Sequence, residues 1–231
     1  MRFGQGRRGA HDQVGVTSAS TVWLFAQSDT NAGRQAFLTI LNPNQATLAA
    51  VTATFYGTNG HPVGAWTIVV DALRRGNIKV NDVLPNAAVA VVVTSNVPVV
   101  VERPQYEGPA NLNQAVSGSD VFGLNGGAAS WLFPGGDIGT GNQELLYLFN
   151  PGLKTVQIRI TMFGATGASV QSTLAVAANS RSSLDLNSIH GLPAGPAGAR
   201  LQSINGQVFI AERTELNAAR QTDSGTQGIA Q

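Results

Sequence analysis

The sequence predicts an all-β protein built from two tandem immunoglobulin-like β-sandwich domains of about seven strands each. Two observations lead to this fold class. The first is an internal repeat of about 108 residues, which is a normal size for one domain. The second is a two-residue alternation of apolar and polar side chains in short segments, separated by turns that draw on 27 glycines and 10 prolines.

The repeat is clearest in two stretches that share one order of features: a Trp-led apolar triplet, a polar loop with glycine, an apolar segment and an Asn-Pro step. WLFAQSDTNAGRQAFLTILNPN covers residues 23–44, and WLFPGGDIGTGNQELLYLFNPG covers residues 131–152. The matching positions, each pair 108 residues apart, are Trp23 and Trp131, Asn42 and Asn150, and Pro43 and Pro151.

Both copies contain strands in which every second residue is apolar. In the first copy Val51, Ala53 and Phe55 alternate with threonine and tyrosine, and in the second Ile158 and Ile160 alternate with arginine and threonine. One face of such a strand packs on a core, and the other meets water. A glycine-containing loop and a further extended segment follow each of them, which predicts a β-hairpin in both copies.

The other predicted strands follow at spacings near ten residues, and neither copy contains a convincing helical segment. In chain order the paired segments are TVWLFA and SWLF, FLTIL and LLYLF, VGAWTIVV and ASVQSTLAV, NIKVND and SSLDLNS, AAVAVVVTS and GARLQSI, and VPVVVERPQY and GQVFIAERTEL. The predicted organisation is therefore a flexible N-terminal arm over residues 1–10, a first repeat over 11–117, and a second repeat over 118–231 with a strand-like tail.

A connecting segment occurs three times and gives both ends of the sequence a strand-like character. HDQVGVTSAS begins at His11, SDVFGLNGGA begins at Ser119, and TDSGTQGIAQ, a poorer version, begins at Thr222. Such ends fit a segment of a longer tandem array or a subunit that lends a strand to its neighbour. The candidate assembly strands carry Val14, Val16 and Ile229 as their expected inward residues.

Composition excludes several classes of function. Charged residues make up 12% of the chain and leave a net charge of +1, which is a weak basis for binding nucleic acid. The basic residues Arg2, Arg7 and Arg8 lie in the glycine-rich arm. The chain has no cysteine, no apolar run long enough to span a membrane, and no apolar core of a secretory signal near its start. Few charges and little net charge favour assembly.

The repeated residues have structural explanations. Trp23 and Trp131 are expected to anchor the core, rather than to form an exposed platform that stacks on sugars. Asn42-Pro43 and Asn150-Pro151 are expected to fix a turn, because proline ends a strand and the asparagine side chain bonds the turn backbone.

Two Glu-Arg steps, Glu102-Arg103 and Glu212-Arg213, also recur. Structural ion pairing or protection of a sheet edge is the expected role. A catalytic carboxylate is the alternative, but no second acid or histidine recurs beside the step.

No catalytic, metal or cofactor site is predicted. His11, His61 and His190 are scattered, and neither His61 nor His190 has a counterpart in the other copy. The DTNAG segment at Asp29 imitates the start of a calcium loop, but its glycine is one place early and the twelfth position is isoleucine. Neither a phosphate loop nor a nucleophile elbow is present.

The order HDQVGVTSASTVWLFAQ, FLTILNPN and VPVVVERPQY resembles the tandem β-sandwich repeats of large surface-exposed or secreted bacterial proteins, whose units typically read GHDSVGV, TWYFAEG, YLLLQNPN and VVAERPMY. The resemblance covers nearly the whole chain as two units. The second unit departs from the pattern, with NPG for NPN and ERTEL for ERPMY. Most units of this family are functionally uncharacterised, so the resemblance implies extracellular architecture rather than a reaction.

The sequence therefore predicts a non-catalytic structural module of a bacterial surface or extracellular assembly, self-associating or joined to neighbouring repeats, with head-to-tail filaments as one form. A carbohydrate- or protein-binding adhesin module is the alternative, and exposed aromatic residues along one face would favour it. An enzyme and a viral structural sandwich are further alternatives.

Overall fold

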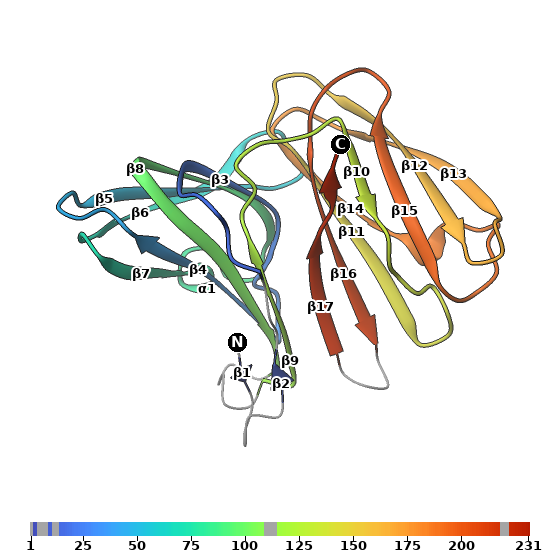
Figure 1. The fold of residues 1–231 in the computed structure, drawn as a ribbon, viewed down its shortest axis with the longest axis horizontal. Coiled ribbons are helices and arrows are strands. Elements are labelled where there is room, and N and C mark those ends of the chain that lie inside the picture. The colour runs from blue at the N-terminus through green and yellow to red at the C-terminus, as the bar shows by residue number, and fades with distance from the viewer. Residues whose placement is uncertain (1, 4–8, 11–13, 109–114, 218–221) are drawn as a thin grey trace. The chain divides into compact units, whose positions relative to one another are not determined.

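The computed structural model describes all residues except 1, 4–8, 11–13, 109–114 and 218–221. The chain divides into two compact units. Unit 1 comprises Met1–Gly57 and His61–Gly126, and unit 2 comprises Thr58–Gly60 and Gly127–Gln231. Both are all-β and consist of antiparallel sheets, as the alternation of the sequence predicts (Figure 1).

Unit 1 is a sandwich whose two sheets share one long strand. Its strands are β1 (Arg2–Phe3), β2 (Gly9–Ala10), β3 (Ser20–Asp29), β4 (Arg34–Asn42), β5 (Ala49–Tyr56), β6 (Pro62–Val70), β7 (Arg74–Lys79), β8 (Ala88–Glu107) and β9 (Ser117–Phe122). The order is β6-β5-β8-β3 on one side and β7-β4-β8-β9 on the other. The 20-residue β8 serves both sheets, because its first half pairs with β5 and its second half with β4 (Figure 1).

Unit 2 repeats this arrangement with a break in the long strand. Its strands are β10 (Ser130–Phe133), β11 (Asn142–Asn150), β12 (Val156–Gly164), β13 (Ser169–Val176), β14 (Ser180–Asp185), β15 (Ala197–Ser203), β16 (Ile210–Asn217), β17 (Thr222–Gln227) and β18 (Ile229–Ala230). The orders are β13-β12-β15-β10-β18 and β14-β11-β16-β17. Strands β15 and β16 therefore take the places of the two halves of β8.

The division between the units falls after Gly126, whereas the repeat predicted a boundary after residue 117. The reason is β9, which the repeat assigns to the second copy. It pairs with the second half of β8 and completes a sheet of unit 1. In unit 2, β17 pairs with β16 in the corresponding way. Each unit thus takes its last strand from the connecting segment that follows it.

One predicted strand in each copy is partly helical. NIKVND ends as the helix α1 (Val80–Val83), and SSLDLNS ends as the 3-10 turn η2 (Leu186–Ser188). An asparagine in each turn bonds a neighbouring strand. Asn81 Nδ2 donates to Arg34 O at 2.9 Å, and Asn187 Nδ2 donates to Asn142 O at 3.0 Å. These cross-strand bonds hold a turn where the pattern predicted an extended end.

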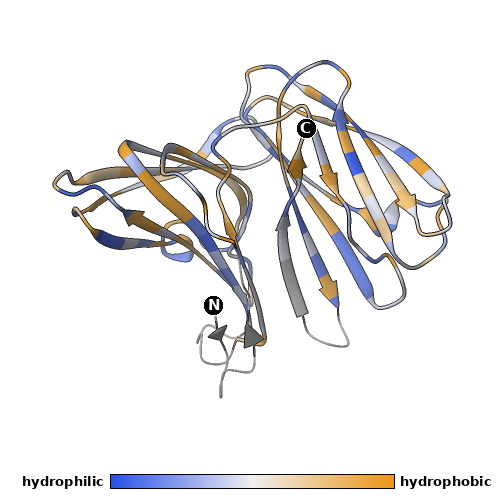
Figure 2. Ribbon diagram, in the orientation of Figure 1, coloured by the Kyte–Doolittle hydropathy of each residue, from blue (hydrophilic) through white to orange (hydrophobic). Residues whose placement is uncertain are grey.

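The core of each unit lies between its sheets. In β5, buried residues alternate with exposed or partly exposed ones, as a strand with one covered face requires. Figure 2 shows hydrophobic and hydrophilic residues following one another along the strands of both units. The fully buried apolar side chains include Phe25, Leu38, Phe55 and Val101 in unit 1, and Phe133, Leu148, Ile158 and Phe209 in unit 2.

The two repeated tryptophans are buried in equivalent places. Trp23 is 2% exposed and Trp131 is 1% exposed. Each indole donates to a backbone carbonyl far along the chain: Trp23 Nε1 donates to Val99 O at 2.8 Å, and Trp131 Nε1 donates to Phe209 O at 3.0 Å. Burial of the ring together with satisfaction of its one donor is what such a side chain needs in a core.

The two asparagines of the Asn-Pro steps are fully buried. Each side-chain amide donates to three backbone carbonyls at corresponding positions of its unit. Asn42 Nδ2 donates to Thr47 O, Val70 O and Asp71 O at 2.9, 2.9 and 3.1 Å. Asn150 Nδ2 repeats the set in unit 2 with the carbonyls of Lys154, Val176 and Ala177, at 2.8, 3.0 and 3.0 Å.

Replacing the buried indole should destabilise unit 2. We expect Trp131→Ala to lower the free energy of unfolding by about 3–5 kcal/mol, because it leaves a cavity and removes one of the two donors to the Phe209 carbonyl, which keeps the bond from Ala128 N. Trp66→Ala is the matched control, since Trp66 is 50% exposed. Urea unfolding followed by circular dichroism measures both. Equal, small losses for the two variants would contradict the anchor role.

Removing the asparagine amide should have a comparable effect without removing a large apolar group. Asn150→Ala leaves three carbonyls without their shared donor, so we expect a loss of about 2–4 kcal/mol in the same measurement. Leu153→Ala, in the same turn and 87% exposed, is the control. A loss below about 0.5 kcal/mol for Asn150→Ala would show that water replaces the amide.

Candidate functional site

Both Glu-Arg steps lie in interior strands. Glu102 and Arg103 are in β8, between β4 and β9, and Glu212 and Arg213 are in β16, between β11 and β17. Protection of a sheet edge therefore does not apply, because each segment is hydrogen-bonded on both sides. Because successive residues of a strand point to opposite faces, the glutamate and the arginine of one step do not face each other. Each side chain therefore contacts residues from elsewhere in the chain.

In unit 2 the arginine lies between two carboxylates. Arg213 Nε is 3.4 Å from Glu144 Oε2, and Arg213 Nη2 is 2.8 Å from Glu215 Oε1. Glu144 is 2% exposed, and its Oε1 accepts a hydrogen bond from Asp137 N at 2.7 Å. Burial raises the pKa of Glu144 to about 7, although this bond and Arg213 oppose the rise. The arginine also lies over the ring of Phe133, 5.6 Å from its centroid, so the cluster is packed into the unit.

In unit 1 the arginine points inward and the glutamate outward. Arg103 is 2% exposed, and its Nη1 donates to Gln105 Oε1 at 3.2 Å. The same amide oxygen accepts from Asp29 N at 3.0 Å. Arg103 thus belongs to a buried polar network that joins β8 to the end of β3.

Glu102 forms a carboxyl pair with Asp120 on the outer side of the same sheet. The two side chains share a hydrogen bond, and Asp120 is 6% exposed. Burial, followed by the bond to Asp120 and the charge of Asp120, raises the pKa of Glu102 to about 8, while Arg75 acts in the opposite direction. Two hydrogen-bonded carboxyl groups are more stable when they share one proton than when both are ionised.

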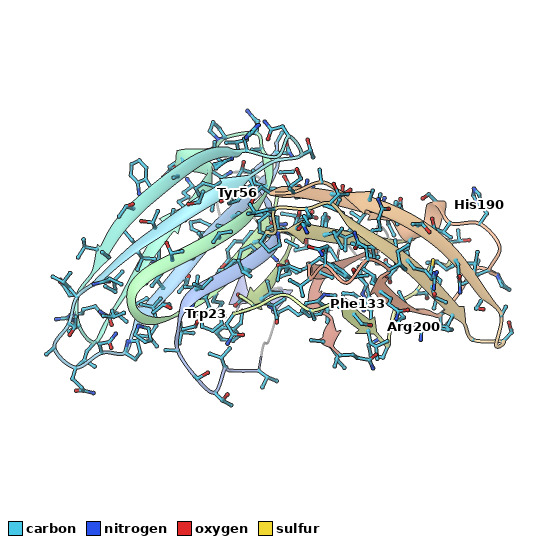
Figure 3. The ribbon with its side chains drawn as sticks, turned by 90° about the horizontal axis from the view of Figure 1, so that it is seen from above. Trp23, Tyr56, Phe133, His190 and Arg200 are labelled. Atoms are coloured by element: carbon cyan, nitrogen blue, oxygen red, sulfur yellow. The ribbon has the colours of Figure 1, made fainter. Side chains whose placement is uncertain are left out.

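The histidines do not come together. His61 and His190 are exposed, and Figure 3 shows His190 on an outer loop of unit 2, while His11 lies outside the described residues. The calcium-like loop is a polar turn: Asp29 Oδ1 accepts from Asn31 N at 2.9 Å, and Asp29 pairs with Arg34. The described part of the chain contains no cluster of three or more metal-ligating side chains. No helix within the described ranges has the length and apolar character needed to cross a membrane.

The C-terminal candidate strand lies on its own unit. Strand β17 pairs with β16, and β18 pairs with β10 through Trp131↔Ala230 and Leu132↔Ile229. The Ile229 side chain is 61% exposed in the single chain, so its burial in a neighbouring copy, as expected of a donated strand, stays a prediction. The N-terminal candidate is different: Val14 is 88% exposed and Val16 is 36% exposed, and residues 14–17 are described without being part of a strand.

A glycine, rather than an apolar side chain, faces the core in the connecting segments. A Cβ on Gly123 would lie 2.8 Å from Trp23 Cβ and 2.8 Å from Phe25 Cζ. A Cβ on Gly228 would lie 2.9 Å from Phe133 Cζ and 3.1 Å from an atom of the Trp131 ring, so both glycines lie against a Trp-x-Phe pair. The isolated bridge Leu24↔Leu124 matches the pair Leu132↔Ile229, which places Gly123 and Gly228 in the same register.

A pocket on the outer side of unit 1 contains the aromatic residues that the sequence left unassigned. It has a volume of about 470 Å³ and is bordered by strands β4, β6, β7 and β8 and by α1. Phe37 and Tyr106 meet edge to face, with ring centroids 6.0 Å apart, and Trp66 is 50% exposed. The polar residues of its lining are Thr39, Arg75, Asn77, Lys79 and Asp82.

Sequence reasoning missed this pocket because its residues are far apart along the chain. The signal that could have found it is the alternation of β6: Trp66 is the one large aromatic residue of a segment whose copy in the second repeat has none.

A family model with the description "Family of unknown function (DUF5719)" matches residues 126–209, which is about a third of the chain and, apart from Gly126, lies in unit 2. No functionally curated protein matches the chain.

Among solved structures, a crystal structure of a Thermotoga maritima protein is similar at 23% identity, covers 46% of this chain and 96% of its own, and has a TM-score of 0.42. The Anabaena sensory rhodopsin transducer is similar at 27% identity over 38% of this chain and 99% of its own, with a TM-score of 0.34. A Streptomyces avermitilis α-L-rhamnosidase complexed with L-rhamnose is similar at 12% identity over 91% of this chain and 28% of its own, with a TM-score of 0.22. TM-scores at this level assign no function.

The carboxyl pair should make the stability of unit 1 depend on pH. The folded state raises the pKa of Glu102 from 4.5 to about 8, so it holds a proton that the unfolded chain releases. The stabilisation is complete below about pH 4.5 and is lost as the pH rises towards about 8. Relative to Glu102→Gln, we expect the wild type to lose roughly 1–3 kcal/mol across this window in urea unfolding. Asp82→Asn, at an exposed carboxylate, should keep the wild-type dependence, and an unchanged profile in Glu102→Gln would contradict proton sharing.

Proposed function

We propose that this protein is a non-catalytic structural module of a bacterial surface or extracellular assembly, in which copies join head to tail through the N-terminal segment. Each unit would then be a variant of the immunoglobulin-like sandwich, closed by a connecting strand. The observation that carries the proposal is the third occurrence of the glycine-centred segment, at Val14–Val16, which is not part of a strand and fills neither of the two places that the units provide.

The glycine at the centre of the N-terminal segment indicates which surface this segment contacts. In alignment with SDVFGL, the segment HDQVGV places Gly15 where Gly123 lies, and Gly228 is its counterpart in unit 2. At those two positions a side chain would collide with the Trp-x-Phe pair below. Among the residues that the structure describes, none lies within 4 Å of a Cβ built on Gly15. Its own surroundings therefore do not require a glycine there, whereas a Trp-x-Phe face would.

The acceptor is the face of unit 2 in a second copy. Within the repeat, the connecting segment comes directly after the strand that carries the Glu-Arg step. For the N-terminal segment, the matching strand in a preceding copy would be β16 of unit 2. The place that the incoming segment would take is held in that copy by β17, which pairs with β16 over six residues, and by β18. Strand β18 has two residues and its Ile229 is 61% exposed, so this end is the more easily displaced, and the incoming segment replaces the ladder of β17 with its own. Pairing of an incoming segment with a sheet edge supplies backbone hydrogen bonds, as in other cases of strand addition.

A contact of this kind joins two different surfaces, so it need not close into a ring and can continue as a filament. A chain with 12% charged residues and a net charge of +1 has little repulsion to oppose it. The resemblance to tandem repeats of secreted and surface proteins supports the location. In a longer array the same contact would join neighbouring repeats.

Assembly should depend on Gly15. We expect the full-length protein to form concentration-dependent oligomers in sedimentation velocity, and Gly15→Val to reduce the association constant by about tenfold or more, because the added side chain meets the Trp-x-Phe face. Gly126→Val is the matched control, since among the described residues a Cβ there also has nothing within 4 Å, and Gly126 lies outside the acceptor face of unit 2. Removal of residues 1–20 should abolish assembly.

Electron microscopy of the same samples shows whether the oligomers are extended. A full-length protein that stays monomeric at high concentration would overturn the proposal. So would a Gly15→Val or truncated protein that assembles like the wild type.

A further inference from the structure

The aromatic pocket of unit 1 is not required by the fold. Strand pairing places Trp66 opposite Ala53 and Ser172 opposite Ile160, so Ser172 occupies the position of Trp66 in unit 2. By the same reasoning Tyr106, opposite Gln35, corresponds to Leu216, opposite Gln143. The same architecture therefore forms without these rings, and the 50% exposed Trp66 contributes little to the core.

The polar residues of the pocket offer both donors and acceptors around the rings. Asn77 Oδ1 accepts from Thr39 Oγ1 at 3.1 Å and from Arg75 Nη2 at 3.3 Å. Asn77 Nδ2 donates to no other residue of the described chain, so both of its N–H groups can donate to a ligand. Asp82, whose side chain is 70% exposed, offers carboxylate oxygens at the rim.

The charges of the lining nearly cancel. Lys79 and Asp82 form an ion pair at 3.3 Å, and Arg75 faces the Glu102 and Asp120 carboxyl pair. A ligand with a strong charge of either sign would meet as much repulsion as attraction here. The pocket therefore favours a neutral ligand with a flat apolar face and a rim of hydroxyl groups.

We infer that this pocket binds a neutral oligosaccharide, with a sugar ring stacked on Trp66 and its hydroxyl groups bonded to Asn77, Arg75 and Asp82. A pyranose presents apolar C–H groups on its faces and hydroxyls at its edge, which matches an aromatic ring surrounded by mixed donors and acceptors. The volume of about 470 Å³ is within the range of small-molecule pockets. A second hollow of about 660 Å³ shares Thr39, Arg75, Pro104 and Tyr106 with it, so the surface extends beyond one sugar.

Affinity electrophoresis of the full chain tests this inference. The gels contain one soluble neutral polysaccharide each, dextran, glucomannan, xyloglucan or a mixed-linkage β-glucan, with alginate as the anionic comparison. We expect retardation by at least one neutral polymer and none by alginate. Trp66→Ala should weaken binding by about tenfold or more, and Trp66→Phe, which keeps an aromatic face, should restore part of it. Ser172→Ala, at the same place in unit 2, should bind like the wild type.

A second readout separates binding from folding. Trp23 and Trp131 are buried, so Trp66 is the exposed one of the three tryptophans. Ligand should protect the wild-type fluorescence against acrylamide and leave Trp66→Phe unchanged, while thermal unfolding of both variants shows that the fold is intact. Failure of all four neutral polymers, retardation by alginate alone, or equal retardation of Trp66→Ala would overturn the inference. Gly15 and Val16 line the second hollow but not the Trp66 pocket, so Gly15→Val should leave stacking on Trp66 in place and Trp66→Ala should leave assembly in place. The two proposals can therefore fail separately.

Discussion

The structure depends most on one side-chain amide in each unit, that of Asn42 and of Asn150. Each lies at the end of a strand in one sheet and donates to the end of a strand in the other, to Val70 O or Val176 O. The same amide also holds the turn that follows, so sheet spacing and turn geometry are fixed together. Because both asparagines are fully buried, water cannot take over these bonds at low cost. The indole bonds of the tryptophans add a second tie at another point of each sandwich.

Much of the fold follows from local pattern, and less of it from topology. Alternation and repetition are properties of neighbouring residues, so strands such as β5 and β12 and the buried tryptophans could be predicted. A repeat does not define where one unit ends, however. Strand β9 belongs to unit 1 because it pairs with β8, and nothing in the residues of β9 indicates this partner. The same limit applies to the site: Trp66 and Tyr106 are 40 positions apart, and the proton-sharing pair of Glu102 and Asp120 joins two strands.

The two units share the contacts that join their sheets and differ at their surfaces. The residues that tie the sheets together are the same in both, whereas the outer faces differ. Unit 1 presents aromatic rings on the side where unit 2 has Ser172 and Leu216. Near its Glu-Arg step, unit 2 instead holds the Arg213 cluster with Glu144. A sandwich tolerates such divergence at Trp66 and Ser172 because β6 and β13 are the edge strands of their sheets, and at Tyr106 because alternate residues of β8 face outward.

The continuity of β8 has a mechanical consequence. An unbroken strand that serves both sheets of unit 1 transmits tension from one sheet to the other through its own covalent backbone. In unit 2 the corresponding path is interrupted between Ser203 and Ile210, so a load passes through a six-residue loop and the hydrogen bonds beside it. A fibre made of such subunits would stretch unevenly: unit 2 would extend first as a compliant link, and unit 1 would remain the stiff element that preserves its outer face under strain.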